Sequence, residues 1–324
     1  MKILIYKTEG YLPHEVTEGH IEKIKNVDPS IEVVTVSALG DNQAELQLVD
    51  AEVVAGISQA LPSSYEKAQN LKWIQTFSAG VDRVLTSEII KRDIMISNIA
   101  GSQDSPIAEH ILGFLLMFTK KFYVSFKDQT SKTWERDVEA TELREKTVVI
   151  VGLGNIGKEA ARLLSCVGAR VYGVDQEGAE KPEYVEALYG PDEWEHVLPL
   201  ADFVVLCLPH TEKTHHLFGR EKFAIMKNTA VLVNIARGGL VHERDLIDAL
   251  QQKVIAGAAL DVMEHEPLAQ DSPLWDMEHV VLTPHRAGHS EKYMDRAIDI
   301  FCINLKSYLA GEQLPNFVDK QKGY

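Results

Sequence analysis

The sequence predicts an α/β protein built from two doubly wound parallel sheets. Short apolar runs, each of a length suited to a buried strand, alternate with polar stretches of helical spacing along most of the chain. The alternation forms two series separated by a long apolar segment, and a glycine-rich turn follows the first strand of the second series. With 324 residues, of which 45% are hydrophobic, the chain is long enough for about two domains.

The first series of apolar runs extends from residue 2 to residue 98. Its predicted strands are Ile3–Tyr6, Ile31–Val36, Ala51–Ile57, Leu71–Phe77 and Ile94–Ile96. The polar stretches between them are long enough for the helical crossovers that parallel strands require. We therefore expect a parallel sheet here.

A long apolar segment, Ser105–Phe126, separates the two series. Because Pro106 lies in its first turn and no glycine or proline follows Gly113, it is predicted to form one helix. The strands predicted after it are Thr147–Val151, Ala169–Val174, Asp202–Leu208, Ala230–Ile235, Ile255–Leu260 and Val280–Leu282. These runs can form one doubly wound sheet, and a last helix is predicted over Ser290–Leu309.

Composition narrows the classes of partner and compartment. A formal net charge of −15 argues against a nucleic-acid partner, which would need clustered Lys and Arg. No stretch approaches the roughly 20 apolar residues of a membrane span, and the run at Met1–Tyr6 is too short for a secretion signal. The three cysteines form no CxxC pair, so the cytoplasm is expected. Cys166 and Cys207 fall in apolar runs and are expected to be buried.

The glycine turn is the most informative motif. The strand Thr147–Val151 passes directly into Gly152–Gly157, of sequence GLGNIG, and a helix pattern follows. In this context Gly152 permits a tight turn, Gly154 lets the backbone reach a pyrophosphate, and Gly157 allows close helix–strand packing. The turn therefore predicts a Rossmann-like dinucleotide site.

The nucleotide itself is predicted by the residues after the turn. Asn155 and Ile156 begin the helix, whose N-terminal amides and positive dipole end bind phosphate. Asp175 ends the next strand, 18 residues beyond Gly157, where a carboxylate accepts hydrogen bonds from the adenosine ribose and repels a 2′-phosphate. No arginine follows it directly, so NAD is expected in preference to NADP.

Three residues that follow later strands could supply chemistry: Arg237, Glu266 and His285. Carboxyl ends of parallel strands face the crevice where ligands bind, so these side chains can converge. Each alone could be an ordinary loop residue. A histidine group, His210, His215 and His216, matches no metal-ligand spacing, so a polar loop without metal is expected there.

The chain resembles the D-isomer-specific 2-hydroxyacid dehydrogenases, a family that includes glyoxylate/hydroxypyruvate reductases and phosphoglycerate dehydrogenases. The resemblance spans nearly the whole chain. It rests on the Gly152–Gly157 turn, the segment Asn234–Val241, the stretch Leu260–Leu268, and Leu282–His285 with Gly288 behind it.

The resemblance implies an oxidoreductase that transfers a hydride between NAD(H) and a small 2-keto or 2-hydroxy acid. It implies that Arg237 binds the substrate carboxylate and carbonyl, that His285 is the acid/base, and that Glu266 supports His285. These roles suit the residue types: a histidine can donate the proton that the carbonyl oxygen receives. An arginine can pair with a carboxylate and polarise a carbonyl.

The same resemblance implies further contacts. Backbone amides of the turn containing Ser78, Ala79 and Gly80 would bind the substrate carboxylate. The residues implied on the cofactor side, besides the glycine turn and Asp175, are Leu208, Pro209, Thr214, Ala236, Asp261, His285 and Gly288. Arg286 could favour a second anionic group on the substrate or point to solvent, and both alternatives stay open.

We expect an NAD-binding Rossmann-like domain over residues 99–287, inserted into a substrate domain formed by residues 1–98 and 288–324. The Ser105–Phe126 helix suggests a homodimer, as in the family. Two alternatives stay open. Formate dehydrogenases carry Gln where this chain has Glu266, so the Glu–His pair favours carbonyl chemistry. An NAD-sensing corepressor-like protein would bind the cofactor without turnover, and the identity of the acid is not predicted.

Overall fold

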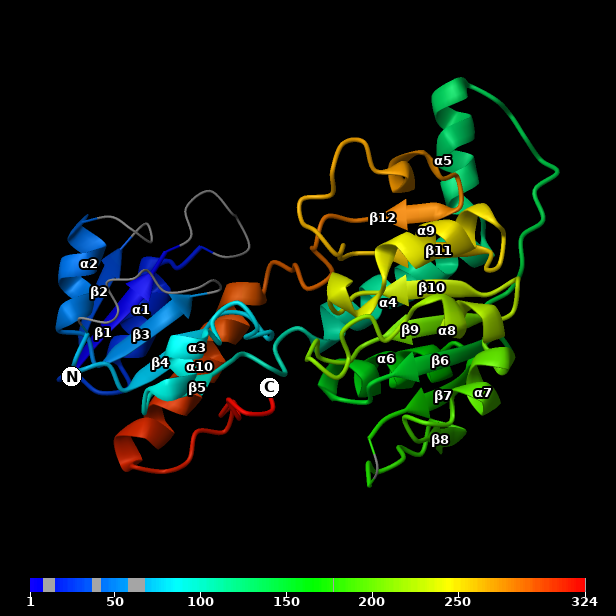
Figure 1. The fold of residues 1–324 in the computed structure, drawn as a ribbon. Helices are drawn as coiled ribbons and strands as arrows, with labels where there is room; N and C mark the ends of the chain where they lie inside the picture. Colours follow the sequence, from blue (N-terminus) through cyan, green and yellow to red (C-terminus); the bar gives the residue numbers. More distant parts are fainter. Residues whose placement is uncertain (8–14, 37–41, 58–67, 177, 324) are drawn as a thin grey trace. The chain divides into compact units, whose positions relative to one another are not determined.

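The computed structural model describes residues 1–324 except 8–14, 37–41, 58–67, 177 and 324. The chain forms two compact units, one of Met1–Gln103 with His289–Tyr324 and one of Asp104–Gly288. Each unit is a parallel sheet covered by helices on both faces (Figure 1). The predicted fold class, two doubly wound α/β units, is confirmed.

The first unit contains a five-stranded sheet of order β2-β1-β3-β4-β5, in which every described pairing is parallel. Its strands are β1 (Lys2–Tyr6), β2 (Glu32–Val36), β3 (Val53–Ile57), β4 (Trp73–Thr76) and β5 (Met95–Ser97). Its helices are α1 (Glu18–Lys25), α2 (Asn42–Val49), α3 (Ser87–Lys91) and α10 (Tyr293–Ala310). All five predicted strands are present, with ends that differ by one or two residues.

Alternating side chains of these strands fill two cores. Ile3, Ile5 and Trp73 pack with α1 and α10 on one face, whereas Leu4 and Ile74 pack with α2 and α3 on the other. Burial on both faces explains why these strands appear in the sequence as continuous apolar runs. The helix α10 brings the C-terminal part of the chain into the first unit.

The second unit contains a seven-stranded parallel sheet of order β12-β11-β10-β9-β6-β7-β8. Its strands are β6 (Thr147–Val151), β7 (Arg170–Val174), β8 (Ala187–Tyr189), β9 (Phe203–Leu206), β10 (Val231–Asn234), β11 (Gly257–Leu260) and β12 (Val280–Leu282). The six strands predicted here are confirmed. The edge strand β8 was not predicted, because three half-buried residues carry too short an apolar pattern.

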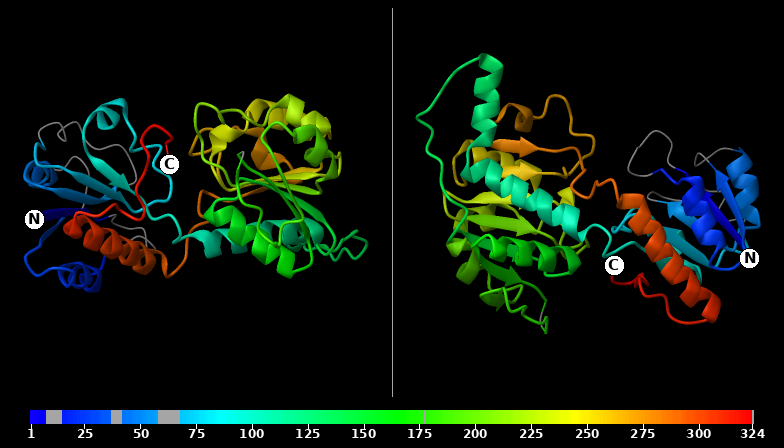
Figure 2. Two further views of the ribbon diagram at one scale, coloured as in Figure 1. Left: turned by 90° about the horizontal axis from the view of Figure 1, so that it is seen from below. Right: turned by 180° about the vertical axis from the view of Figure 1, so that it is seen from behind.

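Helices cover both faces of this sheet. The α-helices of the unit are α4 (Asp104–Thr119), α5 (Phe122–Ser131), α6 (Asn155–Cys166), α7 (Trp194–Val197), α8 (Arg220–Ile225) and α9 (Glu243–Gln251), of which α5 buries none of its residues. Helices α4 and α6 lie side by side on one face (Figure 2), and α7, α8 and α9 pack on the other. The strand order reverses at β6, whose neighbours are β7 and β9, and ligands bind at such a switch point in open α/β sheets.

The prediction of one helix over Ser105–Phe126 was wrong. The segment forms two helices, α4 and α5, separated at Lys121, which has a left-handed backbone with φ of 56°. Just before the break the hydroxyl of Thr119 donates to the carbonyl of Leu115, a contact that competes with the helical ladder. The sequence carries no glycine or proline to signal this interruption.

The cysteines differ from expectation at one position. Cys166 ends α6 and is exposed, because it falls outside the buried stripe of that helix. Cys207 is partly buried and Cys302 is buried. Among the residues that the structure describes, no helix is long and apolar enough to cross a membrane.

Candidate active site

The glycine turn adopts the geometry that its sequence predicts. Gly152 has a φ of 93°, and a Cβ there would lie 2.9 Å from the backbone of Cys207, so only glycine fits both the turn and the neighbouring strand. At Gly157 a Cβ would overlap the carbonyl of Gly152. The close packing of β6, α6 and the segment after β9 therefore depends on these two glycines.

The start of α6 fits a bound pyrophosphate. Gly154 is its N-cap residue, and no side chain caps the helix. A Cβ on Gly154 would meet no atom within 4 Å, so the approach to the first helical turn, which begins at Asn155 and Ile156, is open on that side. Uncapped amides and a positive dipole end in an open turn are suited to an anion.

Asp175 follows β7 at the same end of the sheet. Its Oδ2 accepts from the amide of Leu153 at 2.7 Å, and its Oδ1 accepts from the amide of Gln176 at 2.7 Å. The carboxylate thus tethers the glycine turn to the end of β7. It stands where the ribose of a dinucleotide bound at this turn is expected.

The segment after β9 passes beside the glycine turn at Leu208. Its path is fixed by the hydroxyl of Thr214, which donates to the carbonyl of Pro209 at 2.8 Å and accepts from the amide of Thr211 at 2.8 Å. The predicted cofactor residues Leu208, Pro209 and Thr214 therefore belong to one tightly bonded loop, next to the turn.

Arg237 lies in the loop after β10, a half-buried position. The loop is shaped by Asn234, whose buried amide group donates to the carbonyl of Arg237 and accepts from the amide of Ala236. Arg237 donates from Nη1 to the carbonyl of Ala236 at 2.7 Å. A Cβ on Gly238 would overlap the backbone of Met263, so this loop packs directly against the loop after β11.

Glu266 and His285 are brought together from the ends of neighbouring strands. The imidazole Nδ1 of His285 lies 2.9 Å from Oε2 and 3.1 Å from Oε1 of Glu266. The side chain of His285 is 44% exposed and that of Glu266 is 25% exposed, so solvent still reaches the pair. The amide of Met263 donates to Oε1 of Glu266, which helps to fix the carboxylate.

Asp261 is buried directly behind His285, with 2% of its surface exposed. Its Oδ1 accepts from the hydroxyl of Thr283 and the amide of Arg286, and its Oδ2 accepts from the amide of Ala287. Its main-chain carbonyl accepts from the amide of His285 at 2.7 Å. The predicted cofactor residue thus holds the segment that carries the predicted acid/base. Gly288 ends the unit just after this segment.

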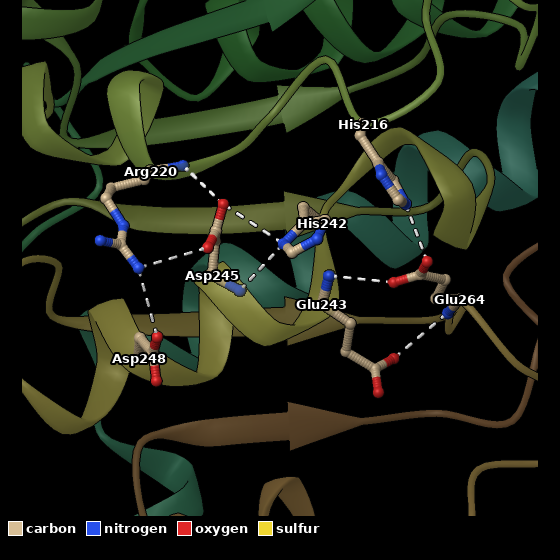
Figure 3. Close-up of polar contacts among 7 residues, drawn as sticks. All are labelled: His216, Arg220, His242, Glu243, Asp245, Asp248 and Glu264. Carbon is tan, nitrogen blue, oxygen red and sulfur yellow. Dashed lines mark hydrogen bonds and ion pairs between the residues drawn. The ribbon is translucent and has the colours of Figure 1, made fainter.

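A polar network anchors the loop that carries Glu266 (Figure 3). Glu264 accepts from Nε2 of His216 at 2.7 Å and from the amide of Glu243 at 3.1 Å, and its own amide donates back to the Glu243 carboxylate. Burial opposes ionisation of Glu264, but these hydrogen bonds outweigh it and hold the pKa of Glu264 below its usual value. The network joins this loop to the start of α9.

The start of α9 is itself fixed by charge. His242 caps the helix by accepting from the amide of Asp245, and Arg220 reaches both Asp245 and Asp248 (Figure 3). Nearby, His210 Nε2 lies 3.0 Å from His215 Nδ1. Within the described residues no group of His, Cys, Asp and Glu has the arrangement of a metal site.

The turn at Ser78, Ala79 and Gly80 follows β4 in the first unit. The hydroxyl of Ser78 donates to the carbonyl of Gly80 at 2.7 Å, and Nδ2 of Asn98 donates to the carbonyl of Ala79 at 2.9 Å. The side chains of Ser78 and Asn98 therefore hold the turn by hydrogen bonds to its main-chain carbonyls. Its proposed role toward a substrate stays a prediction.

A profile of the NAD binding domain of D-isomer specific 2-hydroxyacid dehydrogenases matches residues 112–287. The chain belongs to this dehydrogenase family. The expectation of an oxidoreductase of this kind is confirmed. The matched residues contain the glycine turn and all three predicted catalytic residues, Arg237, Glu266 and His285, whose individual roles stay predictions.

Relatives within the family extend the match over most of the chain. The glyoxylate reductase of Thermofilum pendens is 32% identical over 306 residues, which is 93% of this chain and 88% of that protein. The glyoxylate/hydroxypyruvate reductase B of Klebsiella pneumoniae is 32% identical and covers 98% of each chain.

A solved family structure shows the same fold. The NADPH-dependent glyoxylate/hydroxypyruvate reductase of Sinorhizobium meliloti, crystallised with NADP and sulfate, matches with a TM-score of 0.84 at 27% identity, over 100% of each chain. A dinucleotide site is thus a property of the family.

Several residues of the site were not predicted from the sequence. They are Asn234, Thr283, His216 and Glu264, all of which form hydrogen bonds with backbone groups or with other side chains. The motif Asn234–Val241 pointed to the Arg237 loop but not to the role of Asn234 within it. A polar residue at the last position of a buried strand is the signal that could have found it, because such a group needs partners.

Proposed function

We propose that this chain reduces a small 2-keto acid to the D-2-hydroxy acid with NADH, and catalyses the reverse oxidation. The observation that carries the proposal is the Glu266–His285 pair at the ends of β11 and β12, in the unit that holds the glycine turn. A carboxylate on one ring nitrogen of a histidine orients the imidazole and leaves the other ring nitrogen to face a substrate.

Reduction of the carbonyl needs one hydride and one proton. When bound, the dinucleotide supplies the hydride that reaches C2 of the keto acid. Because Nδ1 of His285 faces Glu266, Nε2 is the nitrogen that would give its proton to the carbonyl oxygen. In the oxidation direction the same nitrogen takes the proton from the hydroxyl group.

Arg237 would bind the substrate. Its guanidinium stays charged and offers a fork of donors, which suits both the carboxylate and the negative charge that develops on the carbonyl oxygen. The hydrogen bonds from Asn234 and the backbone packing at Gly238 hold the Arg237 loop in place before substrate arrives. A fixed donor stabilises the transition state without reorganisation.

Asp175 supports NAD over NADP. A 2′-phosphate on the ribose would lie close to this carboxylate and be repelled by it. The carboxylate is held by two backbone amides, Leu153 and Gln176, so it cannot turn away without losing hydrogen bonds. The Sinorhizobium meliloti relative is NADPH-dependent, so the preference for NAD proposed here rests on Asp175 of this chain.

The remaining contacts are proposed on the family resemblance. Ser78, Ala79 and Gly80 would give a second contact to the substrate carboxylate. Leu208, Pro209, Thr214, Ala236, Asp261 and Gly288 would contact the cofactor, with Asp261 and the loop at Leu208 and Pro209 on its nicotinamide side. The bonded loop at Pro209–Thr214, beside the glycine turn, supports this for the residues after β9.

We also propose a homodimer and a reducing, cytoplasmic setting. Phe122 and Phe126 on α5, and Trp134 after it, are 45%, 58% and 90% exposed, which suits a protein–protein contact at this part of the second unit. Light scattering should give twice the mass of one chain. The few, unpaired cysteines support the compartment.

The test is consumption of NADH with a panel of glyoxylate, hydroxypyruvate, pyruvate and branched 2-keto acids, repeated with NADPH. We expect turnover with at least one acid and a preference for NADH. Tight NADH binding without turnover on any acid would instead support an NAD-sensing protein. Oxidation of formate with no keto-acid reduction would support the formate dehydrogenase alternative.

A further inference from the structure

A chain of hydrogen bonds leads from α4 to the segment that carries His285. Nε2 of His110 lies 3.1 Å from Oγ1 of Thr283, and that hydroxyl donates to Oδ1 of Asp261 at 2.5 Å. His110 and Thr283 are 173 positions apart in the sequence. Neither residue has a part in the chemistry proposed above.

The direction of these hydrogen bonds follows from the atoms present. A hydroxyl has a single proton, and the 2.5 Å separation is typical of an O–H group donating to a carboxylate. The Thr283 hydroxyl therefore donates its proton to the hydrogen bond with Asp261, and it can only accept a hydrogen bond from His110. The imidazole of His110 must then carry its proton on Nε2.

At the Asp261 end, this series of hydrogen bonds holds the backbone around His285. The two carboxylate oxygens of Asp261 accept hydrogen bonds from the amides of Arg286 and Ala287. Its main-chain carbonyl accepts from the amide of His285. His285 has a φ of 49°, a left-handed conformation that is unfavourable for a residue with a side chain. Three consecutive amides bound to one residue keep the segment in this conformation.

At the other end, the series of hydrogen bonds begins at His110 on the helix α4. The ring of His110 packs edge-on against Phe114, with centroids 4.4 Å apart, and the His110 side chain is 21% exposed. The neighbouring α4 residues Ile107, Ile111 and Phe114 are buried in the core of the second unit. The imidazole is therefore fixed by packing, and it can act as a fixed donor.

We propose that His110 and Thr283 are positioning residues for His285. His110 holds the Thr283 hydroxyl, the hydroxyl holds the Asp261 carboxylate, and that carboxylate fixes the backbone from which the imidazole of His285 projects. The proposal rests on the proposed function, because it gives His285 the acid/base role. The restraint that it places on the backbone of residues 285–287 can be measured by hydrogen exchange, without any turnover.

The test compares His110→Phe, which keeps a packed ring but removes the donor, with His110→Gln, whose amide nitrogen can donate from a similar place. Thr283→Val removes this hydrogen bond together with the one that the hydroxyl donates to Asp261, and it serves if His110→Phe does not fold. Glu109→Gln, an exposed neighbour on α4, is the surface control. For each variant we measure kcat, the dissociation constant of NADH, and hydrogen exchange at the amides of Arg286 and Ala287.

We expect His110→Phe to exchange these two amides about tenfold faster and to lose about tenfold in kcat, as the loss of one buried hydrogen bond predicts. Thr283→Val, which loses two hydrogen bonds, should show at least the same effects. NADH affinity should stay within about twofold. His110→Gln should recover most of both losses, and Glu109→Gln should match the wild type.

Unchanged exchange in both His110→Phe and Thr283→Val would overturn the proposal, and so would faster exchange with unchanged kcat. A fall in kcat without faster exchange would also overturn it, because the effect would then not pass through the backbone of residues 285–287. If the wild type turns over no keto acid, the proposed function fails while the exchange comparison still decides whether the restraint exists.

Discussion

The imidazole Nδ1 of His285 lies 2.9 Å from Oε2 of Glu266, although the two residues follow different strands. This contact turns two separate sequence positions into one acid/base unit. It predicts that Glu266→Gln lowers kcat about 100-fold, because an amide cannot stabilise the protonated imidazole. NADH affinity, measured by fluorescence titration, should be unchanged. Asp271→Asn, an exposed acid on the same loop, is the control, and equal losses in both variants would contradict the prediction.

Arg237 is predicted to be needed for its fork-shaped group as well as its charge. Arg237→Lys keeps the charge but loses the paired donors, so kcat/KM for the keto acid should fall about 100-fold. Steady-state kinetics check this, with NADH affinity as the internal control. A lysine variant with wild-type kcat/KM would show that a point charge suffices, or that Arg237 lies away from the substrate.

Asp175 is predicted to set the choice of cofactor. Asp175→Asn keeps an oxygen that can accept from Leu153 but removes the negative charge. We expect the ratio of NADPH to NADH dissociation constants to fall about tenfold or more, since repulsion of the 2′-phosphate is lost. Titration with both dinucleotides measures the ratio. If it does not change, the carboxylate does not face the ribose.

Glu264 is predicted to stabilise the second unit in a pH-dependent way. Its folded pKa is lowered from the usual 4.5, so its contribution is fully present above that pH and is lost as pH falls through the lower folded value. Glu264→Gln should therefore cost about 1 kcal/mol of unfolding free energy at pH 7 and progressively less below pH 4.5. Denaturation of the second unit at several pH values measures the cost. A cost that grows toward acid pH would contradict this account.

The three cysteines are predicted to differ in reactivity. Burial raises the pKa of the Cys207 thiol to about 12 and also raises that of Cys302, whereas Cys166 is exposed. At pH 8 a maleimide should therefore label Cys166 alone in the folded protein, and all three cysteines in urea. Peptide mapping identifies the labelled positions. Rapid labelling of Cys207 in the folded protein would show that the segment after β9 opens.

The sequence was sufficient to predict features that depend on neighbouring residues in the chain. Buried strands appear as apolar runs, and the Gly152–Gly157 turn has a geometry that glycine alone permits. The break at Lys121 and the short strand β8 could not be predicted, because neither carries a distinctive residue type. The contact of His110 with Thr283 joins residues far apart in sequence, and single-residue patterns hold no information on such a pairing.

The central claim is that His285 carries the proton of an NADH-dependent 2-keto acid reduction. The most direct measurement compares His285→Ala with the wild type for turnover of the best keto acid and, in parallel, for NADH affinity. We predict a loss of at least about 1,000-fold in kcat, as expected when a general acid is removed, with NADH affinity within about twofold. Turnover near the wild-type rate, or a large loss of NADH binding, would contradict the claim.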